Sequence, residues 1–225
     1  MAATVAELTP NVAATLIDAL IASNRGDRHA FAFARKTYSY QDVAALMNRT
    51  GNMVRSLGVD KGAHVLLLLP ESPAFVASLL GVIKAGAVPV VGVRVHDAEA
   101  LEHCVATVAP VAAIVHQTQL ERAEKALAAL PAEAVVVVGS EAHGHKSFVD
   151  EVRAQPSWLL AEPVSENAPA LGIWTGSALA TMSHGEVATF INGTGQLGDA
   201  ASSQEMVKLG AMLRAFAKGE EATLT

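Results

Sequence analysis

The stretch that decides the fold runs from Val65 to Val90 and reads VLLLLPESPAFVASLLGVIKAGAVPV. Its first part, Val65–Leu69, is a continuous aliphatic run of strand length, which is typical of a strand buried on both faces of a parallel sheet. Ser72 can cap the helix that follows, with Pro73 at its first helical position. Val88–Val93 then predicts a second buried strand. The stretch therefore predicts a strand–helix–strand unit.

The same alternation continues on both sides of this unit. Downstream, helical and aliphatic runs predict helices over 97–108 and 119–130 and strands over 111–115, 134–138 and 171–174. Upstream, the pattern predicts helices over 12–21 and 41–57, with a short hairpin between them that turns at Arg35-Lys36. Strands that alternate with helices favour an α/β fold, with a doubly wound, mostly parallel sheet flanked by helices.

The chain is expected to divide near residue 192. Residues 1–192 carry the strand–helix alternation, and 156–169 is polar and proline-marked, which indicates a surface connection. Residues 193–225 are interpreted as a linker followed by an amphipathic helix. The apolar stripe of that helix contains Met206, Leu209, Leu213 and Phe216.

Composition argues against several classes of partner and location. The chain has 225 residues, 51% hydrophobic and 17% charged, which indicates that apolar surface is either deeply buried or covered by a partner. Its net charge is −6 without a basic run, so we expect no nucleic acid and no anionic lipid as partner. No apolar run reaches the length that spans a membrane, and the N-terminus lacks a signal-peptide pattern. We expect a cytoplasmic protein.

A few residues could carry chemistry, but each has a plainer interpretation. Cys104, the single cysteine, is more typical of a small core residue than of a nucleophile. His143 and His145 lack a third metal ligand at suitable spacing, which favours a solvated loop. Ser177 lacks the second flanking glycine of a hydrolase nucleophile elbow. Trp158 and Trp174 are interpreted as packing residues. We therefore assign no catalytic residue and no metal site.

Several motifs resemble the opening of the AMP-forming acyl and aryl acid–CoA ligases. They are Thr37-Tyr38-Ser39-Tyr40, Asp42-Val43, Asn48-Arg49, Leu57-Gly58-Val59, Lys61-Gly62, Val65–Pro70, Ser72-Pro73, Phe75 and Lys84-Ala85-Gly86-Ala87-Val88-Pro89-Val90. The resemblance extends over residues 11–192, and 156–174 is similar to the benzoate-type ligases. It implies the N-terminal subdomain of adenylate-forming enzymes. In that family a carboxylic acid and ATP form an acyl adenylate, and CoA then displaces AMP.

The phosphate-binding loop of the family has only a partial counterpart here. Family members carry a Ser/Thr/Gly-rich loop that ends in Pro-Lys-Gly, whereas residues 173–185 read IWTGSALATMSHG. The second glycine and the Pro-Lys-Gly element are absent, and with them the crowded backbone N–H groups and the positive charge that hold triphosphate. Thr175, Gly176, Ser177 and Thr181 are the candidates for a residual anion site, aided by the N-terminus of the next helix. The alternative is a shortened connection between strand and helix.

These observations leave several functional hypotheses open. The leading one is a non-catalytic homologue of the ligase N-terminal portion that binds a ligand or a protein partner, because the later family elements for adenine, ribose and magnesium have no counterpart in these residues. A second is a ligase part completed by a separate protein. A third is a regulator that binds an intact ligase. ATP, AMP and CoA are implied by the resemblance alone. A homodimer is expected, because the subdomain otherwise exposes apolar surface.

Overall fold

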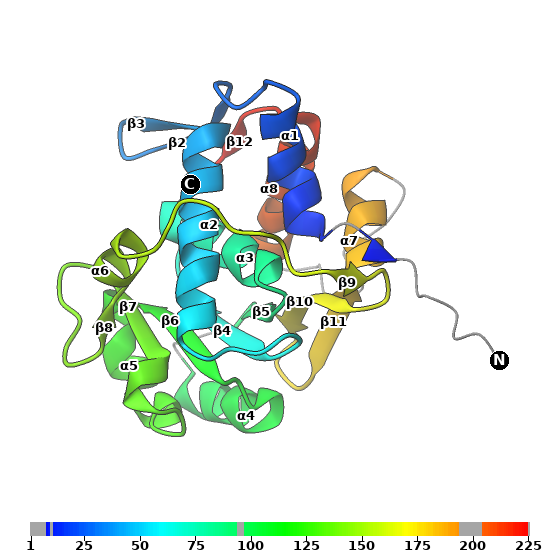
Figure 1. Ribbon diagram of the computed structural model, residues 1–225. Coiled ribbons are helices and arrows are strands. Elements are labelled where there is room, and N and C mark those ends of the chain that lie inside the picture. Colours follow the sequence, from blue (N-terminus) through cyan, green and yellow to red (C-terminus); the bar gives the residue numbers. More distant parts are fainter. Residues whose placement is uncertain (1–7, 10, 94–96, 194–203, 225) are drawn as a thin grey trace.

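A seven-stranded sheet forms the centre of the computed structural model, which describes residues 8–9, 11–93, 97–193 and 204–224 (Figure 1). The strand order is β11-β10-β5-β4-β6-β7-β8, and every neighbouring pair is parallel except β10 with β11. The strands of this sheet are β4 (His64–Leu68), β5 (Val88–Val91), β6 (Ala112–His116), β7 (Val135–Val138), β8 (Lys146–Ser147), β10 (Pro169–Trp174) and β11 (Leu179–Ser183).

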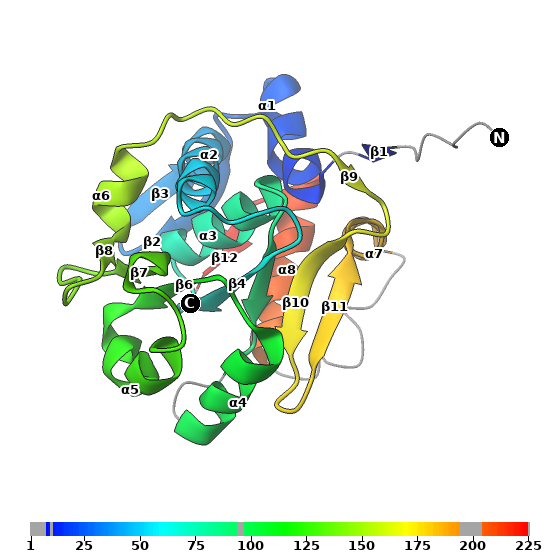
Figure 2. The ribbon, with the colours of Figure 1, turned by 60° about the horizontal axis from the view of Figure 1, so that its bottom comes forward.

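Helices cover both faces of the sheet (Figure 2). In β4, Val65 and Leu67 belong to the hydrophobic cluster with α2 (Tyr40–Ser56) and α3 (Pro73–Lys84). Leu66 and Leu68 belong to the cluster with α4 (Ala98–Val108) and α5 (Gln117–Leu127). Alternate side chains of a strand point to opposite faces, which explains why this strand is aliphatic throughout. The doubly wound, mostly parallel α/β fold is confirmed. The helices are α2 (Tyr40–Ser56), α3 (Pro73–Lys84), α4 (Ala98–Val108), α5 (Gln117–Leu127), α6 (Phe148–Arg153), α7 (His184–Ile191) and α8 (Gln204–Lys218), with short 3₁₀ helix η2 (Ala132–Ala134).

The first helix differs from the regular α-helix that the sequence predicts. Residues 14–18 form a π-helical segment, η1 (Ala14–Asp18), which continues into α1 (Ala19–Ala22). The predicted hairpin follows as β2 (His29–Phe33) and β3 (Lys36–Ser39), with its turn one residue earlier than expected. Ala34 and Arg35 have φ values of 47° and 66°. Two successive positive φ values are the geometry of a tight hairpin turn, so backbone geometry overrides the residue preference here.

The C-terminal residues pack into the same core as the rest of the chain. The predicted stripe on α8 is confirmed, because its four residues are at most 4% exposed and belong to the larger hydrophobic cluster. Strand β12 (Ala222–Thr223) pairs in parallel with β2, and the Tyr40 hydroxyl donates a hydrogen bond to the Glu220 carbonyl at 2.6 Å. The predicted linker falls mostly on 194–203, outside the described residues, so the division at 192 stays a prediction.

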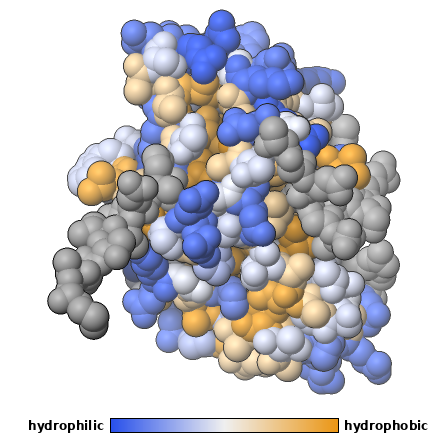
Figure 3. Space-filling view, turned by 90° about the vertical axis from the view of Figure 1, so that its right-hand side faces the viewer, coloured by the Kyte–Doolittle hydropathy of each residue, from blue (hydrophilic) through white to orange (hydrophobic). Residues whose placement is uncertain are grey.

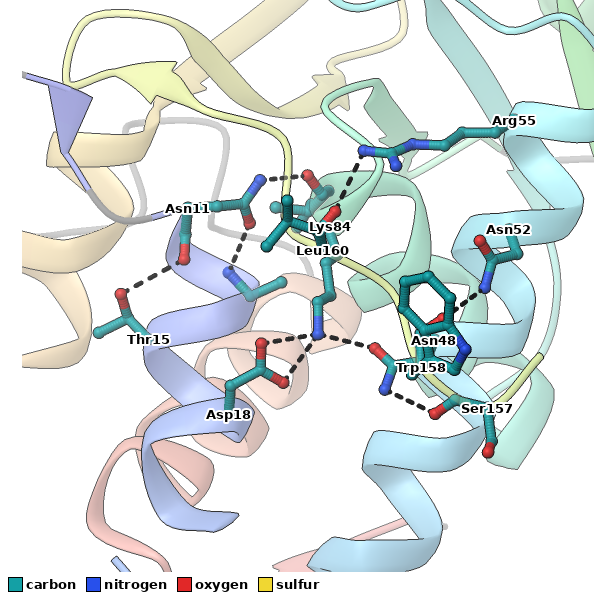
Figure 4. Close-up of polar contacts among 12 residues, drawn as sticks. Asn11, Thr15, Asp18, Asn48, Asn52, Arg55, Lys84, Ser157, Trp158 and Leu160 are labelled. Carbon is teal, nitrogen blue, oxygen red and sulfur yellow. Dashed lines mark hydrogen bonds and ion pairs between the residues drawn. The ribbon is translucent and has the colours of Figure 1, made fainter. Parts of the chain in front are cut away.

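Residues 154–163 form an extended segment that crosses α2. Side chains of α2 donate hydrogen bonds to its carbonyl oxygens, including Asn48 to Ser157 at 2.9 Å and Asn52 to Trp158 at 2.8 Å (Figure 4). The expectation of a surface connection is therefore confirmed. The expectation that Trp158 is a packing residue is wrong, because its side chain is 72% exposed while Leu159 fills the contact with α2. A short antiparallel pair, β1 (Leu8–Thr9) with β9 (Val164–Ser165), follows this segment.

Candidate functional site

The loop that links β10 to β11 occupies the place where the resemblance puts the phosphate loop. The backbone N–H of Thr175 donates to the Ala178 carbonyl at 3.0 Å. The Thr175 hydroxyl donates to the same carbonyl at 3.0 Å and accepts from the Ala178 N–H at 3.3 Å. Gly176 has a φ of 100°, which favours glycine. The loop is therefore a short closed turn whose threonine hydroxyl is engaged by the turn itself.

The structure brings together three of the four candidate anion ligands. Thr175, Gly176 and Ser177 lie in the turn, and all three are exposed. Thr181 is separate from them, because it lies on β11 opposite Gly172. It is two residues beyond Leu179, where the strand begins, which places it about 7 Å further along the strand. The connection is also longer than a simple strand-to-helix link, because β11 intervenes before α7. On the side of the molecule that faces right in Figure 1, hydrophobic residues are visible between polar ones (Figure 3).

The N-terminus of α7 is occupied by its own side chains. Ser183 and Glu186 form a capping box, in which the Glu186 N–H donates to the Ser183 hydroxyl at 3.2 Å and the Ser183 N–H donates to Glu186 Oε2 at 2.7 Å. The hydrogen bond from the Ser183 backbone lowers the pKa of Glu186. A carboxylate therefore already lies where an incoming anion would sit. Anion binding at the four residues stays a prediction, and this geometry weighs against it.

His184 has a structural position that the sequence did not indicate. Its ring is 3% exposed, and Nδ1 accepts a hydrogen bond from the Val12 N–H at 3.1 Å. Burial, with a smaller effect from the positive charge of Lys61, lowers the pKa of His184 to about 4. A neutral ring that accepts a backbone hydrogen bond joins α7 to the first helix rather than facing a substrate.

Lys84, from the Lys-Ala-Gly motif, is buried and paired (Figure 4). Its ammonium lies 2.6 Å from Asp18 Oδ2 and 2.7 Å from Asn48 Oδ1, and the residue is 2% exposed. Asn11 adds a hydrogen bond from Nδ2 to the Ile83 carbonyl at 2.7 Å. These contacts tie η1, α2 and α3 together. Because the ammonium is enclosed by its partners, its role is structural.

A pocket of about 290 Å³ lies at the carboxyl ends of the parallel strands. It occurs beside the point where β5 and β6 lie on opposite sides of β4, which is where open α/β sheets commonly form ligand crevices. Its walls are mostly apolar, and α8 and the C-terminal residues close one side. The lining residues are Leu67, Leu68, Leu69, Pro70, Glu71, Phe75, Val91, Gly92, Val93, Gln119, Met206, Lys208, Leu209, Met212, Thr223 and Leu224.

The remaining sequence candidates lie apart from this edge or within the core. Cys104 is buried, and burial raises the pKa of its thiol to about 11, so its interpretation as a core residue is confirmed. Trp174 is also buried, as expected, and its ring packs edge-on against His103 at 5.5 Å. His143 Nε2 lies 3.5 Å from Glu141 Oε2, whereas His145 Nδ1 lies 3.4 Å from the Ala132 carbonyl. The two imidazoles therefore have different neighbours.

None of the helices that the structure describes has both the length and the apolar character needed to cross a membrane.

Known proteins of the same architecture are adenylate-forming enzymes. A crystal structure of an anthranilate CoA ligase in complex with anthranoyl-AMP matches all of this chain with a TM-score of 0.81 and 21% identity. A benzoate CoA ligase from Burkholderia xenovorans matches 82% of the chain with a TM-score of 0.73 and 18% identity. At these identities the likeness concerns the fold. Residues 20–178 match the AMP-binding enzyme family, and the chain therefore belongs to this family.

Similarity in sequence to characterised relatives is confined to a shorter stretch. A 3-hydroxybenzoate/4-hydroxybenzoate CoA ligase of Thauera aromatica is 39% identical over 80 residues, which cover 36% of this chain and 15% of that enzyme. The chain as a whole corresponds to 46% of the anthranilate CoA ligase. It thus spans less than half the length of this structural relative.

Proposed function

We propose that this chain binds a ligand or a protein partner and does not form an acyl adenylate by itself. The observation that carries the proposal is the closed turn at Thr175–Ala178, whose threonine hydroxyl and backbone groups bond to each other. The turn contains no lysine, and the capping carboxylate of Glu186 occupies the next helix N-terminus. Electrostatic stabilisation of a phosphoryl-linked transition state therefore has no evident source at this edge.

A pyrophosphate-release assay tests this proposal. The pure chain is mixed with ATP, Mg²⁺, CoA and benzoate or 3-hydroxybenzoate, with a complete benzoate-type ligase as positive control. We expect no release above background, and calorimetric titration with ATP under the same conditions should show no saturable binding. A burst of pyrophosphate comparable to the amount of chain would overturn the proposal.

A loop variant tests how far the closed turn accounts for the expected lack of ATP binding and pyrophosphate release. Replacing residues 178–180 with a longer loop that contains the family's Pro-Lys-Gly element supplies the missing charge and turn flexibility. We expect weak ATP binding at most and still no pyrophosphate release, because the 225 residues contain no counterpart of the family's adenine, ribose and magnesium elements. Release by this variant would mean that the loop alone prevents catalysis.

A second candidate function is a ligase part that is completed by a separate protein. Its support is the match of residues 20–178 to the AMP-binding enzyme family, together with the correspondence of the chain to 46% of an anthranilate CoA ligase. The test is to mix the chain with a polypeptide that carries the remaining elements of a benzoate-type ligase. Pyrophosphate release in the mixture, but in neither component alone, would support this function over the first.

A further inference from the structure

The pocket at the carboxyl edge of the sheet has the size of a small-molecule site. Its volume of about 290 Å³ approaches the lower end of typical ligand pockets, about 300 Å³, and exceeds the roughly 150 Å³ cavity that accommodates benzene in other proteins. One substituted aromatic ring, or a compact aliphatic molecule of that size, fits such a volume. Met206 and Met212 in the α8 wall are flexible and adapt to the shape of a ligand.

A polar group in the wall, the side-chain oxygen of Gln119, has no partner among the residues that the structure describes. Gln119, near the N-terminus of α5, lines the pocket, and its Oε1 is buried without a hydrogen-bond partner among the described residues. A buried acceptor that has lost its water and gained no other partner destabilises the folded chain until a donor reaches it. Because the terminal amide of glutamine rotates in a broad profile, Oε1 can turn toward a donor inside the pocket. A ligand with one O–H or N–H group would therefore satisfy it.

The two charged residues in the described lining of the pocket favour a neutral ligand. Lys208 Nζ lies 3.9 Å from Glu71 Oε2, and both residues contribute to the lining. A carboxylate ligand would be attracted by the ammonium but repelled by the neighbouring carboxylate, while its desolvation among leucine, valine and phenylalanine side chains is costly. An uncharged molecule avoids this cost.

We infer that this pocket binds a small, neutral, largely apolar molecule that donates one hydrogen bond to Gln119 Oε1, with phenol as the simplest example. The inference goes beyond the proposed function, since the pocket can be occupied whether or not the chain forms an adenylate. The pyrophosphate assay therefore tests the proposed function, and a binding assay with phenol tests the pocket. A negative result in one does not decide the other.

The test is a titration of the full chain with phenol, toluene and benzoate, followed by NMR of methionine methyl groups. We expect phenol to shift the Met206 and Met212 signals saturably, and to bind about tenfold more tightly than toluene, which has the same shape without the donor. Benzoate should bind more weakly than phenol. Absence of saturable phenol binding, or tighter binding of benzoate, would overturn the inference.

Two variants locate the donor contact. Gln119→Leu removes the acceptor, so phenol and toluene should bind with equal affinity, whereas the matched change Gln155→Leu, on the 154–163 segment, should leave the tenfold preference intact. Retention of the preference in Gln119→Leu would contradict the assignment. Competition between phenol and toluene for one site in the unmodified chain gives a check that does not depend on the folding of any variant, and independent binding of the two would also overturn the inference.

Discussion

His184 illustrates how a single buried ring couples stability to pH. The pKa of its ring is about 4 in the folded chain, below the ordinary value of 6.5, because burial disfavours the charged form. Between pH 4 and pH 6.5 the His184 ring is protonated in the unfolded chain but stays neutral in the folded chain. The stability that this residue contributes is therefore present above pH 6.5 and is lost as the pH falls toward 4.

We predict that His184→Gln reduces the acid sensitivity of the fold. Glutamine can still accept from the Val12 N–H but does not titrate. Between pH 7.5 and pH 5 the unmodified chain should lose about 2 kcal/mol of unfolding free energy through His184, and the variant should be spared that loss. Urea unfolding at the two pH values measures it, with pH 7.5 as the internal reference. Equal losses in both proteins would contradict the prediction.

The ion pair of Lys84 with Asp18 should lose different amounts of stability when one or the other residue is replaced. Asp18→Ala leaves a buried ammonium without its counter-ion and should cost about 3 kcal/mol of unfolding free energy. Lys84→Met instead leaves Asp18, whose side chain is 40% exposed and can be hydrated, so the cost should be about 1 kcal/mol. Urea unfolding of the two variants at pH 7 compares them. A larger loss of unfolding free energy for Lys84→Met than for Asp18→Ala would contradict this prediction.

At the scale of elements, α2 and α3 meet through two glycines. A Cβ built on Gly81 would lie 2.8 Å from the Met47 carbonyl oxygen and 2.9 Å from the Gly51 nitrogen. A Cβ on Gly51 would in turn lie 2.9 Å from the Gly81 carbonyl oxygen. These oxygen and nitrogen atoms belong to the backbone, which cannot rotate away as a side chain can. The two helices are therefore packed more closely than any larger side chain allows.

Gly81→Ala should accordingly destabilise the chain, although alanine is the better helix former. We expect a net loss of about 2 kcal/mol, because separation of the helices outweighs the gain in propensity of about 1 kcal/mol. Ser78→Ala in the same helix is the matched control. Its buried hydroxyl has no hydrogen-bond partner among the described residues, so its removal should be neutral or slightly stabilising. Thermal unfolding of both variants and of the unmodified chain compares their stabilities. A Gly81→Ala variant more stable than the unmodified chain would disprove the close contact.

The elements that the sequence predicted well are those with a local signal. β4, α3 and β5 follow from a continuous apolar run, a serine cap and a proline at the first helical position, and the Ser72 hydroxyl does accept from the Phe75 N–H at 3.2 Å. The two-residue strands β9 and β12 carry no such signal, because their pairing partners lie far away in the sequence. Strand β8 is too short to show an apolar run. The π-helical form of Ala14–Asp18 is likewise invisible to apolar periodicity.

The candidate site was less predictable than the fold. The sequence indicates an incomplete phosphate loop within residues 173–185. The closed turn through the Thr175 hydroxyl, however, depends on the pairing of β10 with β11. The pocket depends on α8 lying over the carboxyl ends of β4 and β5, which no local pattern encodes. Gln119 had no distinguishing signal, since an unpartnered acceptor is a property of its surroundings and not of its sequence neighbours.

At the scale of the whole molecule, α8 covers part of the apolar surface that motivated the dimer hypothesis, and other apolar side chains stay exposed. Trp158 and Leu160 are 72% and 77% exposed, two residues apart on the 154–163 segment, whose carbonyl groups are held by α2. Association therefore costs little backbone conformational entropy at these two residues, because their backbone is already fixed in the single chain. An exposed tryptophan on a fixed backbone is a typical anchor of a protein interface, because tryptophan is enriched among the residues that carry binding energy, and Leu160 adds apolar surface beside it.

We therefore predict a homodimer that uses this pair. Light scattering should give twice the 23.3 kDa of one chain at micromolar concentrations, and the double change Trp158→Ser with Leu160→Ser should return the mass to 23.3 kDa. Val207→Ser, which removes another exposed side chain on α8, is the matched control and should leave the dimer intact. A mass of one chain across a wide concentration range would refute the dimer. A dimer that survives the double change but not Val207→Ser would place the interface on α8, because association then depends on an exposed apolar side chain of that helix.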